Sequence, residues 1–362
     1  MNRRWVGPLL SIVLIIGVVA ALFVSIRNTL LNQQKITVNG LIGSEKEEFF
    51  RDERVQQALD RLGIVVNFEK AGSREIAQKL NNEAYDFGFP AGVPAAEKIR
   101  QDWNLSSQGY DVFFTPMTVA TWQPLAEMLV TSGVARQVDG HYQLDMAQFL
   151  ELVKAGRRWN ELAGNTVFDA SRSILINSTD ITRSNSAAMY LALASYVANG
   201  ETVVQSRAQA DALLPLITDL FVKQGLTGYS SEEPFEDYLI MGMGKAPLVM
   251  IYESQFLAEA ARTGGNIRPE MVLMYPDPGI YTKHVLVPLT ENGRRLGEAL
   301  TTDAELRRLA VEYGFRNTEV AYFQEFVEQH GLDAPRDILD VADTPTFDIL
   351  EYMIQSIQSS TQ

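Results

Sequence analysis

A short pattern of an apolar strand, a glycine-containing turn and a helix occurs three times near the start of this chain. "KITVNGLIGSEKEEFF" holds a strand near residues 36–39 and a helix start at Ser44, which has the spacing of a capping box with Glu47. "IVVNFEKAGSREIAQKL" and "YDFGFPAGVPAAEKI" repeat the pattern, the latter with Pro94 in the first helical turn. Strands that alternate with helices at this spacing predict βαβ units and a parallel sheet.

The longest apolar run lies at the N-terminus. Residues 5–26 contain no charged side chain, and about 20 apolar residues span a bilayer as a helix. The two arginines before them should stay in the cytoplasm, which places the rest of the chain outside it. A cleaved signal peptide is the alternative, but the apolar run continues past the small residues at 19–21, where cleavage would occur. We therefore expect an uncleaved membrane anchor over residues 1–27 and a polar spacer over 28–35.

Composition and motif spacing argue against several classes of function. The net charge of −14 argues against a nucleic-acid partner, because phosphate binding needs clustered Lys and Arg. The chain has no cysteine, so thiol catalysis and disulfides are not available. His141, His284 and His330 are far apart and lack metal-ligand spacing, and the sequence has no Gly-x-Ser-x-Gly elbow or phosphate-binding loop. We expect no catalytic residue, no metal and no cofactor.

Charged residues are dense between Glu45 and Arg54. At helical spacing such residues form i,i+4 pairs on a solvated face. Glycoside hydrolysis would need two carboxylates at one cleft, and nothing in the pattern places two there. We therefore predict that this charged run faces water.

The stretch "ILINSTDITRSNSAAMYLALASYV" (174–197) joins an apolar strand to a helix through a run of polar side chains. Ser, Asn and Asp are preferred before a first helical turn, because their oxygens accept from free amide groups, and one such residue would be enough. A helix N-terminus flanked by hydroxyls also suits an anion or a carboxylate, since it offers N–H donors and a partial positive charge. The segment is therefore either a helix cap or one wall of a ligand site, and its own sequence leaves both readings open.

Four segments resemble type 2 periplasmic (extracellular) solute-binding proteins, and they occur in the order of that family. They are "AGSREIAQKLNNEAYDFGFPA", "STDITRSNSAAMYLALA", "GMGKAPLVMIYESQF" and "GRRLGEALTTDAELRRLAVEYGFR". The likeness covers roughly residues 36–316. It implies an α/β fold of two lobes, each a mostly parallel sheet flanked by helices, with two crossing strands and a ligand cleft between the lobes. Lobe I would comprise residues 36–116 and 280–362, and lobe II residues 117–279.

By the same resemblance, helix starts from both lobes would line the cleft at the carboxyl ends of the strands. Carried over one by one, the ligand-binding residues would be Ser44, Ser73, Arg74, Thr179, Ser184, Asn185, Ser186 and Tyr252. Arg74 and Arg183 each sit beside a candidate serine, where an arginine either clamps a carboxylate or forms a surface salt bridge. Two positions depart from the family pattern. Ala187 replaces a frequent glycine, and Glu253 would oppose an anion if it faced the cleft.

We therefore expect a membrane-anchored solute-binding protein on the extracytoplasmic (periplasmic) side, which captures a small polar or anionic ligand and does no chemistry. A membrane permease would be its partner in transport. The alternative is an anchored sensory or assembly module, in which the same fold recognises a partner protein. The low content of basic residues favours ligand binding through helix dipoles rather than through full charges.

Overall fold

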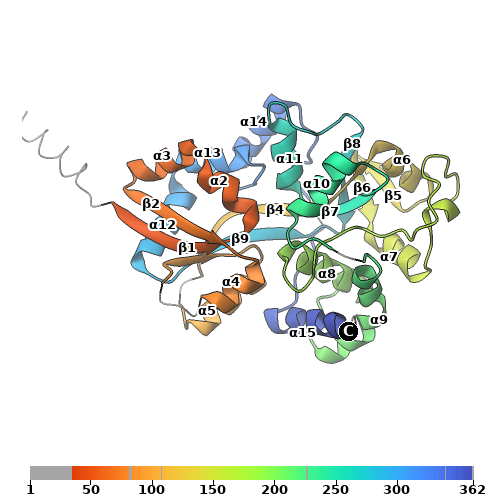
Figure 1. The fold of residues 1–362 in the computed structure, drawn as a ribbon, viewed down its shortest axis with the longest axis horizontal. Helices are drawn as coiled ribbons and strands as arrows, with labels where there is room; N and C mark the ends of the chain where they lie inside the picture. The colour runs from red at the N-terminus through yellow and green to blue at the C-terminus, as the bar shows by residue number, and fades with distance from the viewer. Residues whose placement is uncertain (1–34, 81–83, 107, 226, 339, 361–362) are drawn as a thin grey trace, which may run out of the picture.

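Two α/β lobes lie side by side in the computed structural model of this protein, which describes residues 35–80, 84–106, 108–225, 227–338 and 340–360 (Figure 1). The predicted membrane anchor over residues 1–27, and nearly all of the spacer over 28–35, lie outside the described residues. Among the described residues, no helix combines the length and the apolar character needed to cross a membrane.

Lobe I is a sheet with helices on both faces. Its strands β1 (Ile36–Ile42), β2 (Ile64–Lys70) and β3 (Phe87–Phe89) pair in parallel in the order β2-β1-β3, and β9 (Tyr281–Pro288) runs antiparallel to β3. Val38 and Ile42 join the core on one face and Leu41 joins the core on the other, as side chains alternate along a strand. The first face is covered by α2 (Glu47–Arg51), α3 (Glu53–Arg61), α12 (Glu291–Thr302) and α13 (Ala304–Glu312), and the second by α4 (Ser73–Lys79) and α5 (Val93–Asp102).

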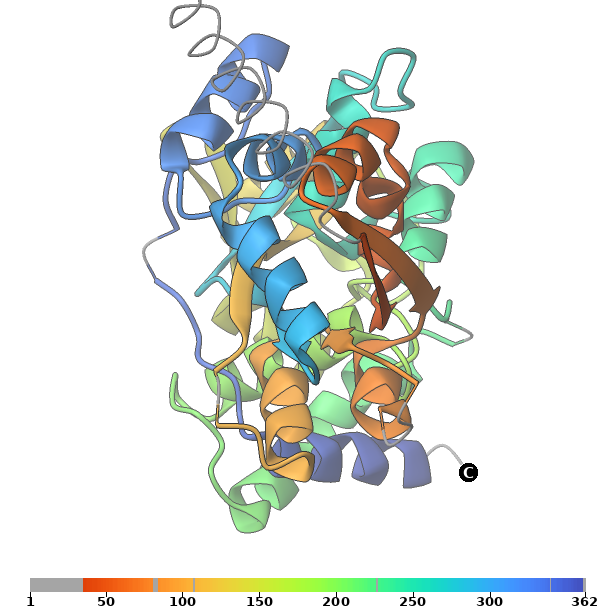
Figure 2. The same ribbon diagram turned by 90° about the vertical axis from the view of Figure 1, so that its left-hand side faces the viewer.

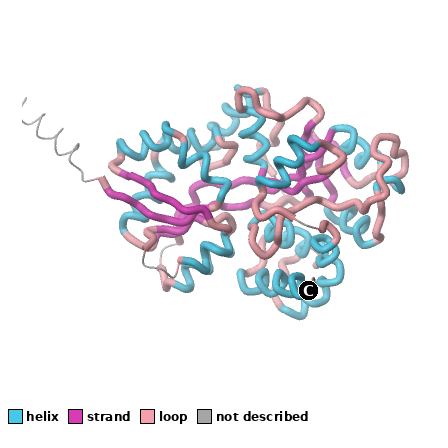
Figure 3. Tube along the Cα trace, in the orientation of Figure 1, coloured by secondary structure: helices cyan, strands magenta, loops and turns pink. Residues whose placement is uncertain are grey.

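One long strand, β4 (Tyr110–Trp122), passes from lobe I into lobe II, and β9 lies beside its first half (Figure 3). The sequence predicts two short strands here, because Pro116 lacks the N–H that a central strand needs. The structure has a single strand instead. Pro116 is the last residue paired with β9, and Met117 is the first paired with β7 (Leu248–Tyr252). The missing donor therefore falls where the strand changes partners.

The sheet of lobe II is mixed, so the expectation of a mostly parallel sheet in each lobe is wrong for this lobe. Strand β4 enters from lobe I antiparallel to both β7 and β8 (Met271–Asp277), and β5 (Ala135–Val138) forms a hairpin with β6 (His141–Asp145). Only the β6–β8 pair is parallel among the paired strands described in this lobe. The helices of the lobe are α6 (Gln123–Thr131), α7 (Met146–Lys154), the 3₁₀ turn η2 (Trp159–Glu161), α8 (Asn185–Ala198), α9 (Arg207–Val222), α10 (Glu232–Met241) and α11 (Glu253–Ala261).

The C-terminal segment does not follow the lobe assignment expected for residues 280–362. After α14 (Val320–His330), the helix α15 (Phe347–Ser359) buries Met353, Ile354 and Ile357 in the core of lobe II, against α9 and α8. It also reaches α5 of lobe I, and Figure 2 shows it running beneath that lobe. An amphipathic sequence predicts that a helix packs but not against which lobe, which is why the assignment differed.

Candidate ligand-binding site

Several helices begin at one hollow of about 370 Å³ between the two lobes, which we call the cleft. Lobe I contributes the starts of the 3₁₀ turn η1 (Ser44–Lys46) and of α4, and lobe II contributes the starts of α8, α10 and α11. The first N–H groups of a helix have no partner within the helix, and they carry a partial positive charge. The cleft is lined by Gly43, Ser44, Glu45, Lys70, Ala71, Gly72, Ser73, Glu75, Arg183, Ser184, Asn185, Tyr229, Ser230, Ser231, Glu232 and Tyr252.

Five of the eight predicted ligand residues line this cleft: Ser44, Ser73, Ser184, Asn185 and Tyr252. The side-chain amide of Asn185 donates to the Tyr252 hydroxyl at 3.0 Å, and the Ser73 hydroxyl accepts from the amide of Ala91 at 2.8 Å. Burial raises the pKa of the Tyr252 hydroxyl well above its usual value, so this phenol stays neutral. These five predicted residues therefore offer neutral hydrogen-bonding groups to the cleft. Ser44 is the first residue of η1 rather than the cap that a Ser44–Glu47 box would require.

Thr179 and Ser186 are buried behind the lining and do not reach the cleft. The two hydroxyls bond to each other at 2.9 Å, and Ser186 also bonds to the hydroxyl of Ser184 at 3.0 Å. Ser184 occupies the N-cap position of α8, yet its side chain makes no capping hydrogen bond. The hydroxyl chain thus orients Ser184, and ordinary side-chain capping does not account for this serine.

The two rims of the cleft touch each other. A Cβ added to Gly72 of lobe I would overlap the carbonyl oxygen of Arg183 in lobe II. A Cβ added to Gly92 of lobe I would lie 2.8 Å from Oδ1 of Asn185, and Gly92 also has a φ of 97°, which favours glycine. At these two points the backbone of lobe I lies directly against the helix start of lobe II.

Comparison with solved structures identifies the fold. The sulfate-binding protein SubI from Mycobacterium tuberculosis H37Rv superimposes with a TM-score of 0.51 at 14% identity, over 83% of this chain and 92% of that one. The periplasmic binding protein AfuA from Actinobacillus pleuropneumoniae, with fructose-6-phosphate bound, gives a TM-score of 0.52 at 13% identity, over 90% and 96%. The apo ferric ion-binding protein A of Pasteurella haemolytica gives 0.52 at 11% identity, over 90% and 95%. The chain has the fold of a type 2 periplasmic solute-binding protein.

Sequence comparison adds nothing to this likeness: no protein-family model and no curated protein sequence matches the chain. At these identities the structural match establishes the solute-binding fold alone. The function of the cleft has to be argued from its own residues.

Arg74 was predicted to contact the ligand. It lies beside the cleft, and its guanidinium binds other groups of the protein instead. Its guanidinium donates to the carbonyls of Ile181 at 3.0 Å and Thr182 at 2.6 Å, and it forms a two-pronged ion pair with Glu351 of α15. The side chain is only 10% exposed. It therefore joins the lobes of the solute-binding fold rather than lining the cleft.

A buried ionic cluster lies under the cleft, and sequence reasoning missed it. Lys46 is fully buried, pairs with Glu45, and donates to Nδ1 of His284 at 3.0 Å. Its ammonium also lies 4.9 Å from the centre of the Phe89 ring. Glu45 and Lys46 belong to the run predicted to face water, and that prediction is wrong for both. It is right for the exposed i,i+4 pair of Glu47 with Arg51 at 2.8 Å.

The protonation states of this cluster follow from burial and charge. Burial alone would raise the pKa of Glu45, but Lys46 and His284 together outweigh burial and hold this pKa well below the usual value. Burial, reinforced by the charge of Lys46, lowers the pKa of His284 to about 4. Burial lowers the pKa of Lys46, whereas the adjacent carboxylate of Glu45 raises it. At neutral pH Glu45 is a carboxylate and His284 is a neutral imidazole. Because Glu45 also lines the cleft, its carboxylate is a fixed negative group there.

Glu253 does not face the cleft, contrary to the concern raised by its place beside Tyr252. It is fully buried and forms a two-pronged ion pair with Arg316, both oxygens at 2.7 Å. The hydroxyl of Tyr275 donates to the same carboxylate at 2.9 Å. Its charge is therefore compensated inside the protein and does not oppose an anion in the cleft.

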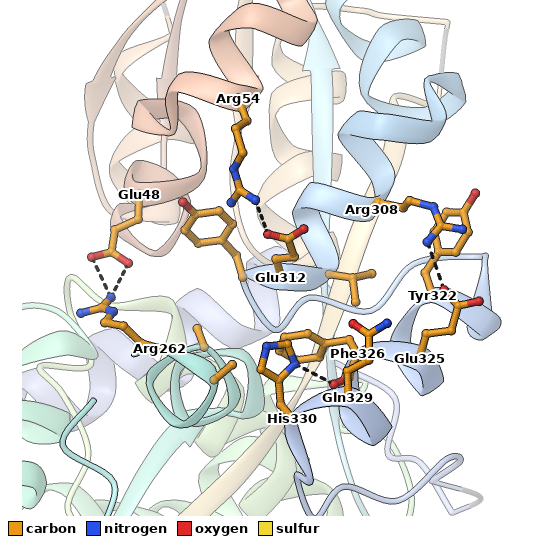
Figure 4. Close-up of a pocket in the computed structure, with 14 residues that line it drawn as sticks. Glu48, Arg54, Arg262, Arg308, Glu312, Tyr322, Glu325, Phe326, Gln329 and His330 are labelled. Atoms are coloured by element: carbon orange, nitrogen blue, oxygen red, sulfur yellow. Dashed lines mark hydrogen bonds and ion pairs between the residues drawn. The ribbon is translucent and has the colours of Figure 1, made fainter. Parts of the chain in front are cut away.

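A second hollow, of about 470 Å³, lies among α2, α3, α11, α13 and α14 (Figure 4). Three of its arginines are each paired with a glutamate of the same hollow. These pairs are Arg54 with Glu312 at 2.6 Å, Arg262 with Glu48 at 2.9 Å and Arg308 with Glu325 at 3.0 Å. Cations already paired in this way offer little to an anionic ligand, so we take the interlobe cleft as the candidate site.

Proposed function

We propose that this chain is a solute-binding protein that captures a small polar or anionic ligand in the interlobe cleft and performs no chemistry on it. The observation that carries the proposal is the convergence of helix starts from both lobes on one hollow lined by Ser44, Ser73, Ser184, Asn185 and Tyr252. Such starts bind anions through free N–H groups and helix dipoles. The sulfate-binding and fructose-6-phosphate-bound neighbours support an anionic group in the ligand.

The charges around the cleft limit which ligands would fit. Glu45 is a fixed carboxylate in the lining, so a ligand that is anionic on every side would be repelled there. A ligand fits better if it carries an anionic group for the helix starts and a hydroxyl or amine that donates to Glu45. Arg183, whose guanidinium stacks 4.2 Å from the centre of the Tyr229 ring, adds a cation at the cleft.

The proposal extends to location and partners. The apolar run over residues 5–26 would anchor the protein in the membrane, with the two lobes on the extracytoplasmic (periplasmic) side. A permease in the same membrane would receive the ligand. Since small-ligand capture needs neither charge complementarity to phosphate backbones nor a cofactor, we propose no nucleic-acid partner and no cofactor.

Removing residues 1–34 should convert a membrane-bound protein into a soluble, folded monomer. The reason is that the apolar run ends at Ile26, whereas the first strand of lobe I begins at Ile36. Membrane fractionation of the full chain and gel filtration of residues 35–362 check this. Recovery of the full chain in the soluble fraction would contradict the anchor, and aggregation of the fragment would contradict the division at residue 35.

Asn185→Asp should weaken binding of an anionic ligand at least tenfold, about 1.4 kcal/mol, while leaving the fold intact. The change keeps the shape of the side chain and adds a negative charge to the first turn of α8, where a helix tolerates it. The carboxylate can still accept from Tyr252, so the contact at 3.0 Å keeps a hydrogen bond. Affinity is measured by calorimetry, after a thermal-shift screen of sulfate, phosphate, sugar phosphates and amino acids has found a ligand that raises the melting temperature.

The matched control is Asn177→Asp, which adds the same charge to lobe II in a hollow that Asn185 does not line. It should leave the affinity unchanged. Equal weakening by both variants would mean that general charge, and not the helix start, governs binding. If no compound in the screen raised the melting temperature, the partner-recognition module would become the better reading.

A further inference from the structure

We propose that Arg74 and the C-terminal helix α15 form a latch that holds the cleft closed without ligand. In the proposed function, opening and closing of two lobes admits and retains the ligand. This inference rests on the proposed function only for its consequence for binding, because the contacts of the latch lie within the chain itself. Its parts come from three places in the sequence: α4 of lobe I, the loop before α8 in lobe II, and α15.

The first part of the latch is the guanidinium of Arg74. It crosses from lobe I to lobe II and donates to two consecutive backbone carbonyls, of Ile181 at 3.0 Å and of Thr182 at 2.6 Å. These residues immediately precede the Arg183–Ser184–Asn185 rim of the cleft, and Ser73 on the opposite rim is the neighbour of Arg74. One buried side chain thus fixes the two rims relative to each other.

The second part is α15, which orients Arg74 and spans the lobes itself. Glu351 binds Nε and Nη2 of Arg74, with Nε at 3.0 Å, and this planar two-pronged geometry leaves the guanidinium little freedom. The buried face of α15 lies in the core of lobe II, through Met353, Ile354 and Ile357. Its other end reaches α5 of lobe I, where the ring of Phe347 lies 6.0 Å from the ammonium of Lys98.

Opening the cleft would therefore carry a cost beyond bending at the crossing strands. When the lobes part, Arg74 of lobe I leaves the carbonyls of Ile181 and Thr182 and, because α15 is packed in the core of lobe II, it also leaves Glu351. Charged groups then lose their hydrogen bonds in a site where Arg74 is 10% and Glu351 is 19% exposed. The latch therefore favours the closed form, and the exposed ion pair of Arg262 with Glu48, which also joins the lobes, contributes much less.

The absence of cysteine from the chain makes a direct test possible. Spin labels on Gln101→Cys of α5 and Ala208→Cys of α9 would sit on exposed positions of two helices that α15 touches, one in each lobe. Double electron–electron resonance on the ligand-free full chain should give one narrow distance distribution. Arg74→Met should add a population at longer distance, and Glu351→Gln should do so to a smaller extent.

Two further variants make the outcome decisive. Gly72→Ala should force the cleft open, because its methyl group would overlap the carbonyl oxygen of Arg183. The distance between the two spin labels in this variant then serves as the reference for an open cleft. Arg262→Met is the matched control and should keep the narrow distribution. A narrow distribution in both Arg74→Met and Glu351→Gln, with circular dichroism showing that they are folded, would overturn the latch. Equal opening by Arg262→Met would overturn the assignment to Arg74. Neither result depends on a ligand, so failure of the latch and failure of the solute-binding function are separable.

Discussion

Replacing Arg316 by methionine should lower the free energy of unfolding by about 3–5 kcal/mol, the cost of removing one partner from a buried ion pair. Arg316 pairs with the fully buried Glu253 through two contacts of 2.7 Å and also donates to the carbonyls of Pro335 and Arg336. Without it, the hydroxyl of Tyr275 would be the one hydrogen-bond donor left to the carboxylate of Glu253 among the described residues. Urea denaturation followed by circular dichroism measures the loss.

Two controls separate this effect from a general loss of charge. Arg308→Met removes an exposed pair with Glu325, and stability should stay nearly unchanged because solvent screens such pairs. The double variant Glu253→Gln with Arg316→Met leaves no uncompensated charge, so it should be more stable than Arg316→Met alone. If Arg316→Met cost no more than Arg308→Met, the carboxylate of Glu253 would have to reach water, which its complete burial contradicts.

The strand and helix starts could be predicted because their signals are local. The start of α4 after Gly72 and the start of α8 after Ser184 fall where the sequence has the turn and N-cap residue types that act over a few positions, although Ser184 makes no capping hydrogen bond. Since parallel strands end at the same edge of a sheet, the resemblance could also place these starts near one another. For that reason five of the eight predicted residues line the cleft.

The remaining residues depend on contacts that sequence spacing does not encode. Lys46 and His284 are 238 positions apart, and both side chains are fully buried. Lys46 is followed by two glutamates, a pattern that is typical of a solvated helix face. A lysine is buried only where another part of the chain supplies a partner for its side chain, and the local sequence does not show that partner. Arg74 was predicted to contact the ligand, but it lies beside the cleft and binds Glu351, which belongs to a tail that no local pattern ties to that position.

The latch and the buried Arg316–Glu253 pair have one feature in common. In both, an arginine binds the C-terminal segment that follows α14. Arg316 binds the carbonyls of Pro335 and Arg336, which fixes the start of the segment near the crossing strands. Glu351 then binds Arg74 at the rim of the cleft. The segment thus runs from the crossing strands to the cleft. Its attachment at Arg316 and its attachment at Arg74 should therefore both influence closure of the cleft.

The free energy of unfolding should depend on pH through His284. The pKa of this residue is about 4 in the folded protein, against 6.5 for an ordinary histidine, because it is buried beside the ammonium of Lys46. Below pH 6.5 the unfolded chain therefore binds a proton that the folded protein does not, and stability is lost as the pH falls toward 4. Linkage gives a loss of about 2 kcal/mol by pH 5 and about 3 kcal/mol by pH 4 from this group alone.

The variant His284→Gln should remove this part of the pH dependence while keeping an acceptor for Lys46. Urea denaturation at pH 7, 6 and 5 measures it, and the stability difference between the parent and the variant should shift by about 2 kcal/mol over this range. His330→Gln is the control, since that ring is exposed and bonds only to the carbonyl of Phe326 among the described residues. Parallel pH curves for the parent and His284→Gln would mean that His284 takes up a proton in the folded state as readily as in the unfolded state. That result would contradict the two causes of the lowered pKa, which are the complete burial of the ring and its 3.0 Å contact with Lys46.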